Sequence, residues 1–395
     1  MPINLSGEKF LFIAYITGEW QTYHRRVMFE KMAKFTGEKI TFLIINRPVD
    51  FIISPLRHYD KWIDRLECNG LDKIFSNLYL YTPKIYLHDQ IALRLRPAVV
   101  LNGKTLKKQL SYIIKQINCE NRKRIVWNMH PDMIDYLDII SSDIKVYDCY
   151  DEYCYSVEGK AREAVFEREK KLLKSVDITF TTSEQLRKNK SLFQPNTHYI
   201  QNATDYELLN RAMIPGIETL PQLKKIKRPI IGYLGAIKNV IDCGLLSYIA
   251  SKNPYWSIVL IGPIQDKSIR KKLKQFSNVY FEGQQEYKNF PNILKGFDVA
   301  MIPFIINDYT KNINPNKMHE YMSAGCQIVS TSLPEVYNYK EFIKIASTKE
   351  EFELFINEYL KNPISYEQRK LQMQAAGKNS WNSRFENMFS LMLGQ

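Results

Sequence analysis

The sequence lacks any long apolar run: nowhere in its 395 residues does a stretch approach the ~18 apolar residues that a membrane-spanning helix needs. Its start also lacks the charged segment, apolar centre and small-residue cleavage site of a signal peptide. The six cysteines are scattered, with no CxxC pair and no Cys/His cluster, which argues against a disulfide framework and a structural metal site. These absences predict a cytoplasmic protein with structural thiols and no metal.

What the sequence does contain is an alternation of strand and helix patterns, in two groups. Apolar runs at 10–16 and 40–45 flank a helical pattern at 23–35, which is typical of a parallel sheet. Between about 203 and 228 the periodicity vanishes and prolines punctuate a polar stretch, and at residue 230 the alternation restarts. We therefore predict an α/β protein of two doubly wound, Rossmann-like domains facing a cleft, with residues 1–205, a linker at 206–228, and residues 229–375.

One segment of the second half predicts an anion site. A buried-strand pattern at 298–304 leads through a polar loop to Asn314 and Pro315. Pro315 is preset for the first turn of a helix that Asn314 can cap, and the free backbone N–H groups there attract phosphate. Lys317 adds a positive charge, and Glu320, three residues later, lies on roughly the same face. A diphosphate beside a carboxylate that accepts hydrogen bonds from sugar hydroxyls is what a nucleotide-sugar site needs.

The formal net charge of +13 is concentrated in one stretch, residues 84–124, which carries ten basic side chains against two acidic ones. Interleaved apolar residues make basic amphipathic helices facing an anionic membrane surface one interpretation. A solvated helix face in a basic protein is the other, and both stay open. The first would place the protein peripherally on the inner face of the cell membrane.

The segment from Pro315 reads Pro-x-Lys-x-x-Glu-Tyr-x-x-x-Gly and is followed by Ile-Val-Ser-Thr at 328–331. This resembles the donor-site motif of glycosyltransferases with the two-domain GT-B architecture, and most closely the family-4-like bacterial enzymes of the teichuronic-acid sort. Segments 231–236, 258–263, 279–283 and 380–384 occur in the order found in that family. We expect a final helix from about residue 365 to 394, and the resemblance implies that its last part, residues 376–395, packs back on the first domain.

The resemblance further implies transfer of a hexosyl group, with retention, from a nucleotide diphosphate sugar to a surface-polysaccharide or lipid-linked acceptor. The donor is most simply a UDP-sugar, and no other cofactor is required. The first domain would face the acceptor and the second would bind the donor. The implied donor-binding residues are Gly235, Lys238, Gly262, Gly283, Gln284, Tyr287, Asn314, Asn316, Lys317 and Glu320.

Two departures from the family pattern concern charge. Where the family has an Arg after the second glycine of the turn and a Lys several residues later, this chain has Ala236 and Ile241, so phosphate neutralisation rests on Lys317 and Lys238. Many family members also carry Glu-x7-Glu, whose second member is Glu320 here, whereas Asn312 replaces the first. An amide hydrogen-bonds a sugar hydroxyl but carries no negative charge beside an oxocarbenium-like transition state.

On the acceptor side we predict His130 and Asp151 as catalytic candidates, because each follows a strand pattern and a base there can accept a hydroxyl proton. On the donor side the resemblance implies a third catalytic candidate, Asn312, whose amide would contact the donor sugar. A hydrogen-bonded loop histidine and helix-capping aspartates, Asp148 included, are the alternatives. Asp148-x-x-Asp151 is not the Asp-x-Asp spacing of metal-dependent transferases. Arg25 or Arg26, near His24 and Trp20, could hold an acceptor phosphate, and surface cations are the alternative.

Two other functions are compatible with parts of this pattern. A nucleotide-sugar 2-epimerase on the same fold would need carboxylates and a histidine crowding the sugar, and Asn312 argues against it. A non-catalytic basic binding protein would suit the net charge, but the sequence holds no nucleic-acid recognition motif. Binding of nucleic acid is therefore not expected.

Overall fold

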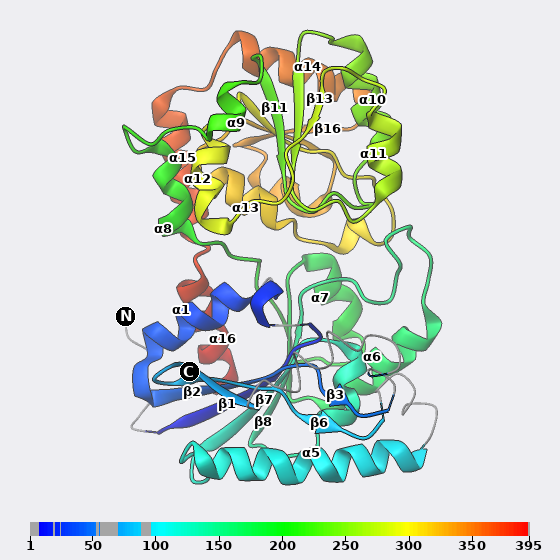
Figure 1. Cartoon of the computed structure of the whole chain (residues 1–395), viewed down its shortest axis with the longest axis vertical. Helices are drawn as coiled ribbons and strands as arrows, with labels where there is room; N and C mark the ends of the chain where they lie inside the picture. The colour runs from blue at the N-terminus through cyan, green and yellow to red at the C-terminus, as the bar shows by residue number, and fades with distance from the viewer. Residues whose placement is uncertain are drawn as a thin grey trace.

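The computed structural model describes residues 8–18, 20–23, 25–52, 55, 70–87 and 96–393. These residues form two domains that lie one above the other along the long axis of the molecule, with the N-terminal domain below (Figure 1). An eight-stranded sheet forms the centre of the N-terminal domain, and a six-stranded sheet forms the centre of the C-terminal domain.

The N-terminal sheet has the strand order β10-β9-β8-β7-β1-β2-β5-β4, and its pairs are parallel except β4 with β5. Its central strands β1 and β2 are apolar runs buried at every position, as a parallel sheet covered on both faces requires. The strands are β1 (Phe10–Tyr15), β2 (Ile40–Ile45), β4 (Leu71–Phe75), β5 (Leu78–Tyr81), β7 (Lys123–Asn128), β8 (Ile144–Cys149), β9 (Ile178–Thr181) and β10 (Thr197–Tyr199). A separate parallel pair joins β3 (Val49–Asp50) to β6 (Lys84–Ile85).

The C-terminal sheet is parallel throughout, with the order β13-β12-β11-β14-β15-β16. It places β11, the first strand of the domain, beside β14, and the strand order reverses there. In such sheets ligands bind at the carboxyl ends of the strands near the reversal. The strands are β11 (Ile230–Leu234), β12 (Ser257–Ile261), β13 (Val279–Phe281), β14 (Val299–Ile302), β15 (Ile328–Thr331) and β16 (Ile343–Ala346).

Helices cover both sheets. In the N-terminal domain they are α1 (Arg26–Thr36), α5 (Arg96–Gln116), α6 (Glu163–Ser175) and α7 (Glu184–Ser191), with 3-10 turns η1 (Trp20–Thr22), η2 (Gly37–Lys39) and η3 (Pro131–Tyr136). In the C-terminal domain they are α10 (Cys243–Lys252), α11 (Lys267–Leu273), α12 (Phe290–Leu294), α13 (Asn316–Ser323), α14 (Lys349–Lys361) and α15 (Tyr366–Gly377), with η5 (Tyr287–Asn289), η6 (Thr310–Asn312) and η7 (Pro334–Tyr339). Within the described residues, no helix combines the length and apolar composition that crossing a bilayer requires.

The last helix, α16 (Trp381–Leu393), returns to the N-terminal domain, where it lies beside α1 (Figure 1). Its aromatic side chains enter the core under β1: the rings of Phe10 and Phe389 lie 5.3 Å apart, and those of Phe12 and Phe385 lie 5.7 Å apart. Burial of such rings is a major source of packing energy. The predicted fold class, including the C-terminal helix that crosses back, is confirmed; the residues at which one domain passes into the other stay a prediction.

Two sequence expectations about local structure were wrong. The stretch predicted as a linker without periodicity contains α8 (Tyr206–Leu209), η4 (Asn210–Met213) and α9 (Pro221–Lys224), because Leu209 and Leu223 are buried in the core of the C-terminal domain. The final helix, expected to run from about residue 365 to 394, is broken between α15 and α16. Ser380 explains the restart, because its hydroxyl accepts a hydrogen bond from the backbone N–H of Ser383 at 3.2 Å.

Candidate functional site

The helix α13 begins at the edge of the C-terminal domain that faces the N-terminal domain (Figure 1). Pro315 is its cap residue and Asn316 its first helical residue, and within the described part of the chain no side chain caps it. The predicted capping by Asn314 is wrong, because the Asn314 amide bonds Glu335 and His319 instead. The first backbone N–H groups of α13 thus have no side-chain acceptor, so they can bind an anion.

The turn after β11 lies against this helix start. Gly235 has a φ of +144°, and a Cβ built on it would lie 2.4 Å from both Cε and Nζ of Lys317. Gly262, after the next strand, has a φ of +145°, and a Cβ there would lie 2.1 Å from the Gly235 carbonyl oxygen. Glycine is therefore needed at both positions, for different reasons: Gly235 makes room for the Lys317 side chain, whereas Gly262 makes room for the neighbouring turn.

A cavity of about 730 Å³ lies between the domains in front of this turn. Its N-terminal wall includes Tyr23, Arg26, Glu30, Thr204 and Trp381. Its C-terminal wall includes Gly235, Tyr287, Asn316, Lys317 and Glu320. Five of the predicted donor-binding residues thus meet in one cavity of a size that holds a small-molecule ligand.

Lys317 and Glu320 are charged residues on the C-terminal wall of this cavity. Burial lowers the pKa of Lys317, Glu320 raises it and Lys238 lowers it again, with a net shift below its ordinary value. Burial raises the pKa of Glu320, and Lys317 opposes that shift. The Lys317 ammonium also lies 5.2 Å from the centre of the Tyr233 ring. A desolvated cation beside a carboxylate provides a phosphate contact and a hydroxyl contact a few ångströms apart.

A second cavity of about 280 Å³ adjoins the first, since both are lined by Asn316, Lys317 and Trp381. Its other lining residues include Lys238 and Asp151. Asp151 Oδ2 accepts a hydrogen bond from the Tyr309 hydroxyl of the other domain at 3.0 Å. Burial raises the pKa of Asp151, although Lys238 lowers it. Burial thus favours the protonated form of Asp151 more than exposure to water would.

His130 has a different position from the one expected. It caps η3, with Nδ1 accepting a hydrogen bond from the Asp132 backbone N–H at 3.1 Å. Its ring packs edge-on against Tyr153, with the centres 4.5 Å apart, and burial lowers its pKa. Neither cavity has His130 among its lining residues. The structure thus supports the alternative interpretation of a hydrogen-bonded loop histidine.

Asn312 lies at the contact between the domains rather than in either cavity. Its side-chain amide donates to the Asp308 carbonyl at 2.5 Å and lies 3.4 Å from the Asn189 amide. Its backbone carbonyl accepts a hydrogen bond from Ser183 at 2.6 Å. Because these contacts occupy the amide, the placement does not support a direct contact with the donor sugar in this arrangement of the domains.

The remaining predicted residues divide between cavity and surface. Tyr287 lines the larger cavity, and its ring packs on Phe290 with the centres 4.7 Å apart. Gly283 and Gln284 are exposed, and neither is among the lining residues of the two cavities. The resemblance would place Gly283 and Gln284 beside the nucleobase, but neither residue forms part of a cavity wall.

Arg25 is not a surface cation, so that expectation for it was wrong, whereas its contact with an acceptor phosphate stays a prediction. It is 2% exposed, and its guanidinium donates to Asp148 at 2.7 Å and to Asn202 at 3.2 Å. Asp148 also accepts from Arg384 of α16 at 3.1 Å, so its expected capping role was wrong too. One buried carboxylate thus pairs with two buried arginines, and burial still lowers the pKa of Arg384 to about 9. His24 lies outside the described residues.

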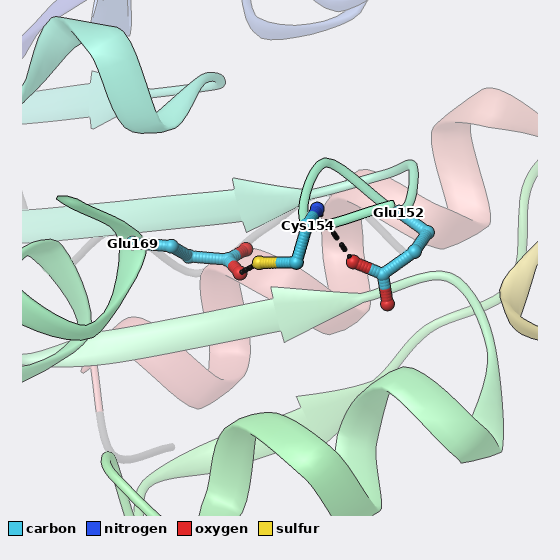
Figure 2. Close-up of side chains that lie close together, drawn as sticks. All are labelled: Glu152, Cys154 and Glu169. Atoms are coloured by element: carbon cyan, nitrogen blue, oxygen red, sulfur yellow. Dashed lines mark hydrogen bonds between the residues drawn. The ribbon is translucent and has the colours of Figure 1, made fainter. Parts of the chain in front are cut away.

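A group of acidic and thiol side chains lies apart from these cavities, on the N-terminal domain (Figure 2). The Cys154 thiol donates to Glu169 and the Cys154 backbone N–H donates to Glu152, each at 2.8 Å. These ligand atoms are close enough to hold a metal ion. However, the Lys190 ammonium lies 2.6 Å from Glu169 and 3.6 Å from Glu152, so the positive charge at this position is already supplied by the protein.

The protonation states agree with that interpretation. Burial raises the pKa of the Cys154 thiol, and a thiol binds a metal as its deprotonated form. Burial would raise the pKa of Glu169, but Lys190 holds it below its ordinary value. The group is thus a buried ion pair that ties α6 to α7, and the structure gives no reason to place a metal there.

Several cavity residues were missed from the sequence. Tyr150, Asn202, Tyr309 and Trp381 line the smaller cavity, and Thr204 lines the larger one. None belongs to a short motif, and Trp381 comes from α16, far along the chain. The Trp-Asn-Ser-Arg pattern at 381–384 was the available signal, but it indicated a family likeness and not a cavity wall.

Comparisons with known proteins agree with this geometry. No family model matches the sequence. The chain is similar to TuaH of Bacillus subtilis strain 168, named as a teichuronic acid biosynthesis glycosyltransferase, with 24% identity over 245 residues. The match covers 55% of this chain and 59% of TuaH, so it spans about three fifths of the length of that relative.

Solved structures match over nearly the whole chain. Sucrose-phosphate synthase from Thermosynechococcus elongatus has a TM-score of 0.69 at 12% identity, covering 97% of this chain and 98% of that one. The α,α-trehalose 6-phosphate synthase from Burkholderia multivorans has a TM-score of 0.68 at 10% identity, with 98% of each chain covered. Anabaena HepE, in complex with UDP and glucose, has a TM-score of 0.64 at 12% identity, covering 98% of this chain and 100% of that one.

These likenesses define the class: the chain has the GT-B fold of two-domain glycosyltransferases. Within that class, the predicted resemblance to teichuronic-acid glycosyltransferases is confirmed by the similarity to the Bacillus subtilis protein.

Proposed function

We propose that this protein is a glycosyltransferase that moves a hexosyl group from a nucleotide diphosphate sugar, most simply a UDP-sugar, to a surface-polysaccharide or lipid-linked acceptor. The observation that carries the proposal is the uncapped start of α13 with Lys317 beside it, opening into the cavity between the domains. The structure of HepE in complex with UDP and glucose supports UDP as the carrier.

In this proposal the diphosphate lies at the start of α13, where backbone N–H groups, Lys317 and Lys238 neutralise it. Lys238 forms no ion pair within the described residues, and it lines the smaller cavity beside Asp151. Glu320 accepts hydrogen bonds from the ribose hydroxyls, and Tyr287 stacks near the base. Because two lysines and a helix start supply the positive charge, binding requires no divalent metal, so UDP should bind equally well with a chelator present.

The acceptor would enter from the N-terminal side and place its hydroxyl near Asp151. We propose transfer with retention, in which a phosphate oxygen of the donor takes the acceptor proton and Asp151 orients the hydroxyl. An inverted product would instead make Asp151 the general base. Gly235 and Gly262 contribute by holding the turn close to the leaving group.

The acceptor side also offers a membrane-facing surface. The exposed face of α5 carries Lys104, Lys107, Lys108 and Lys115 together with Val100, Leu101 and Tyr112, the last being 68% exposed. The helix contains no acidic residue and lies at the far end of the N-terminal domain (Figure 1). We propose that this face rests on anionic lipid, where a lipid-linked acceptor would be anchored. Asp89 and Arg94 of the basic stretch lie outside the described residues.

The test is incubation of the protein with a panel of nucleotide sugars, with NMR of the anomer that is released or transferred. Slow hydrolysis of one UDP-sugar, giving the anomer that matches the donor, supports the proposal. Conversion to a 2-epimer would establish the epimerase alternative. No turnover of any nucleotide sugar, together with no rise in melting temperature in any nucleoside diphosphate, would overturn the enzyme interpretation in favour of a binding protein.

A further inference from the structure

Asn314 is held in place from both domains, although it belongs to the segment that opens α13. Its side-chain N–H donates to Glu335 Oε2 at 3.0 Å, and its side-chain oxygen lies 2.8 Å from His319 Nε2 on α13 itself. Its backbone carbonyl accepts a hydrogen bond from the Asn202 amide at 2.8 Å. Asn314 is 4% exposed. Both the amide nitrogen and the amide oxygen of Asn314 thus have a partner in the protein.

Glu335 is the point where these contacts cross from one domain to the other. It lies on η7 of the C-terminal domain and is 3% exposed. From the N-terminal domain its carboxylate accepts the Glu184 backbone N–H at 2.8 Å and the Tyr199 hydroxyl at 2.6 Å. The Glu335 carboxylate is buried and accepts hydrogen bonds from three donors. Each of these bonds is charge-assisted, and at a buried position water does not readily replace a lost donor, so the orientation of the carboxylate is strongly fixed.

Asn202 completes the arrangement from the other side. It follows β10, is 6% exposed, and its oxygen accepts from Arg25 at 3.2 Å while its amide donates to Asn314. Arg25 is in turn fixed by Asp148 at 2.7 Å. The core of the N-terminal domain is therefore connected, through side chains that are all buried, to the residue directly before the cap of α13.

We propose that Glu335 and Asn202 are positioning residues of the donor site: they clamp Asn314 between the domains and thereby set the direction of the first turn of α13. This inference rests on the proposed function, since it assigns the clamp to the same phosphate-binding helix start. Glu335 lines neither cavity, and Asn202 lines only the smaller one. The Asn202 oxygen is engaged by Arg25 and its amide by Asn314, so both residues act through Asn314. Affinity for the donor then depends on how the two domains meet, and not only on the residues that touch it.

The experiment measures UDP affinity by calorimetry and the melting temperature for the wild type and four variants. Glu335→Gln keeps the shape of the side chain, but it places an amide N–H group opposite the hydroxyl of Tyr199 and the side-chain N–H of Asn314, which are also donors. Asn202→Asp keeps the oxygen that accepts from Arg25, but it replaces the amide N–H that donates to the Asn314 carbonyl with a second, repelling oxygen. Both should raise the Kd for UDP about tenfold, a loss of about 1.4 kcal/mol. Tyr199→Phe removes a single donor and should give a smaller loss.

The matched control is Tyr339→Phe. It removes a different contact between the domains, the 2.6 Å bond from the Tyr339 hydroxyl to Gln201, and reaches the clamp only indirectly, because the Gln201 amide donates to the Tyr199 hydroxyl. It should lower the melting temperature without changing the Kd for UDP. A donor KM that rises in Glu335→Gln and Asn202→Asp while kcat changes little is the matching kinetic result, which a merely structural role would not produce in folded protein.

The outcomes separate the two claims. If the wild type binds UDP and both clamp variants bind it equally well, or if Tyr339→Phe weakens binding as much as they do, the clamp is overturned and the proposed function stands. If Glu335→Gln does not fold, Asn202→Asp and Tyr199→Phe decide by the same criterion. If the wild type binds no UDP, the proposed function fails first and the clamp fails with it.

Discussion

At the scale of single residues, the site depends on a lysine that fits only beside a glycine. Lys317 fills the space where a Cβ of residue 235 would stand. The lysine end can move, but a φ of +144° at position 235 is open essentially to glycine alone. The same residue thus makes room for the cation and supports the turn that faces the diphosphate.

A substitution at that glycine gives a direct prediction. Gly235→Ala should lower the free energy of unfolding by about 1–3 kcal/mol through backbone strain, and should weaken UDP binding by displacing the Lys317 ammonium. Gly103→Ala is the control, because it lies within α5 with open space around it and should stabilise the helix by about 1 kcal/mol. Denaturant titration and calorimetry provide both values; unchanged UDP affinity in Gly235→Ala would contradict this role for the glycine.

Asp151 predicts a pH dependence. Burial raises its pKa above the ordinary 3.8 even though Lys238 opposes the shift. Since the ionised carboxylate orients the acceptor hydroxyl more strongly than the protonated form, kcat/KM should fall as the pH falls through that raised pKa. Asp151→Asn should remove this acid limb and reduce kcat by about tenfold, as expected for one hydrogen bond to a charged group, whereas a loss of about a hundredfold or more would identify Asp151 as a general base. Asp138→Asn, at an exposed ion pair with Lys145, is the control that should leave the profile unchanged.

The residues of the donor side were predictable because their chemistry is local. Lys317, Glu320 and Gly235 belong to short patterns whose backbone consequences follow from the sequence. The buried contacts of Arg25 and Asp148 were not, since they join residues that are 123 positions apart. Asn314 shows the same limit: a helix start favours a capping asparagine, but a glutamate on a distant turn bonds its amide.

At the scale of elements, α5 has two faces. Asn102, Leu106, Leu110, Ile113 and Ile114 are buried against the N-terminal domain, whereas the lysines lie on the opposite side. Buried residues at this spacing fix which side faces outward. The exposed side has the composition of a helix that rests on an anionic bilayer.

The corresponding prediction uses charge reversal. Lys104→Glu, Lys107→Glu and Lys108→Glu together should release the protein from vesicles containing anionic lipid at low salt, since each lysine near such a surface contributes about 1 kcal/mol. The matched control reverses Lys267, Lys271 and Lys272 of α11, which are also exposed. Co-sedimentation is the measurement. Equal retention of both triple variants would show that α5 is a solvated face.

Buried strands were the elements most readily predicted, because apolar runs such as those of β1 and β2 have few alternatives in an α/β protein. The short helices α8 and α9 were missed because four residues show no helical period. The break before α16 was missed because a single serine at position 380 restarts the helix where the amphipathic pattern continues.

At the scale of the whole molecule, the two domains could be predicted but not how they meet. Each sheet could be predicted from the local alternation of strand and helix patterns. The contact between the domains could not, because it includes polar pairs that are distant in sequence, such as the Glu184 backbone N–H with Glu335, 151 positions apart. The cavities exist only because of that docking, since both domains line them. The position of a diphosphate between the domains is therefore the claim on which the account depends.

The measurement that tests it most directly is a calorimetric titration of UDP into the wild type, Lys317→Ala and Lys361→Ala. Lys361 is exposed at the end of α14, so its removal changes the net charge equally. We expect the wild type and Lys361→Ala to bind UDP alike, and Lys317→Ala to bind at least about tenfold more weakly, since a charge-assisted phosphate contact is lost. Equal UDP affinity in all three proteins would contradict the placement of the diphosphate at α13.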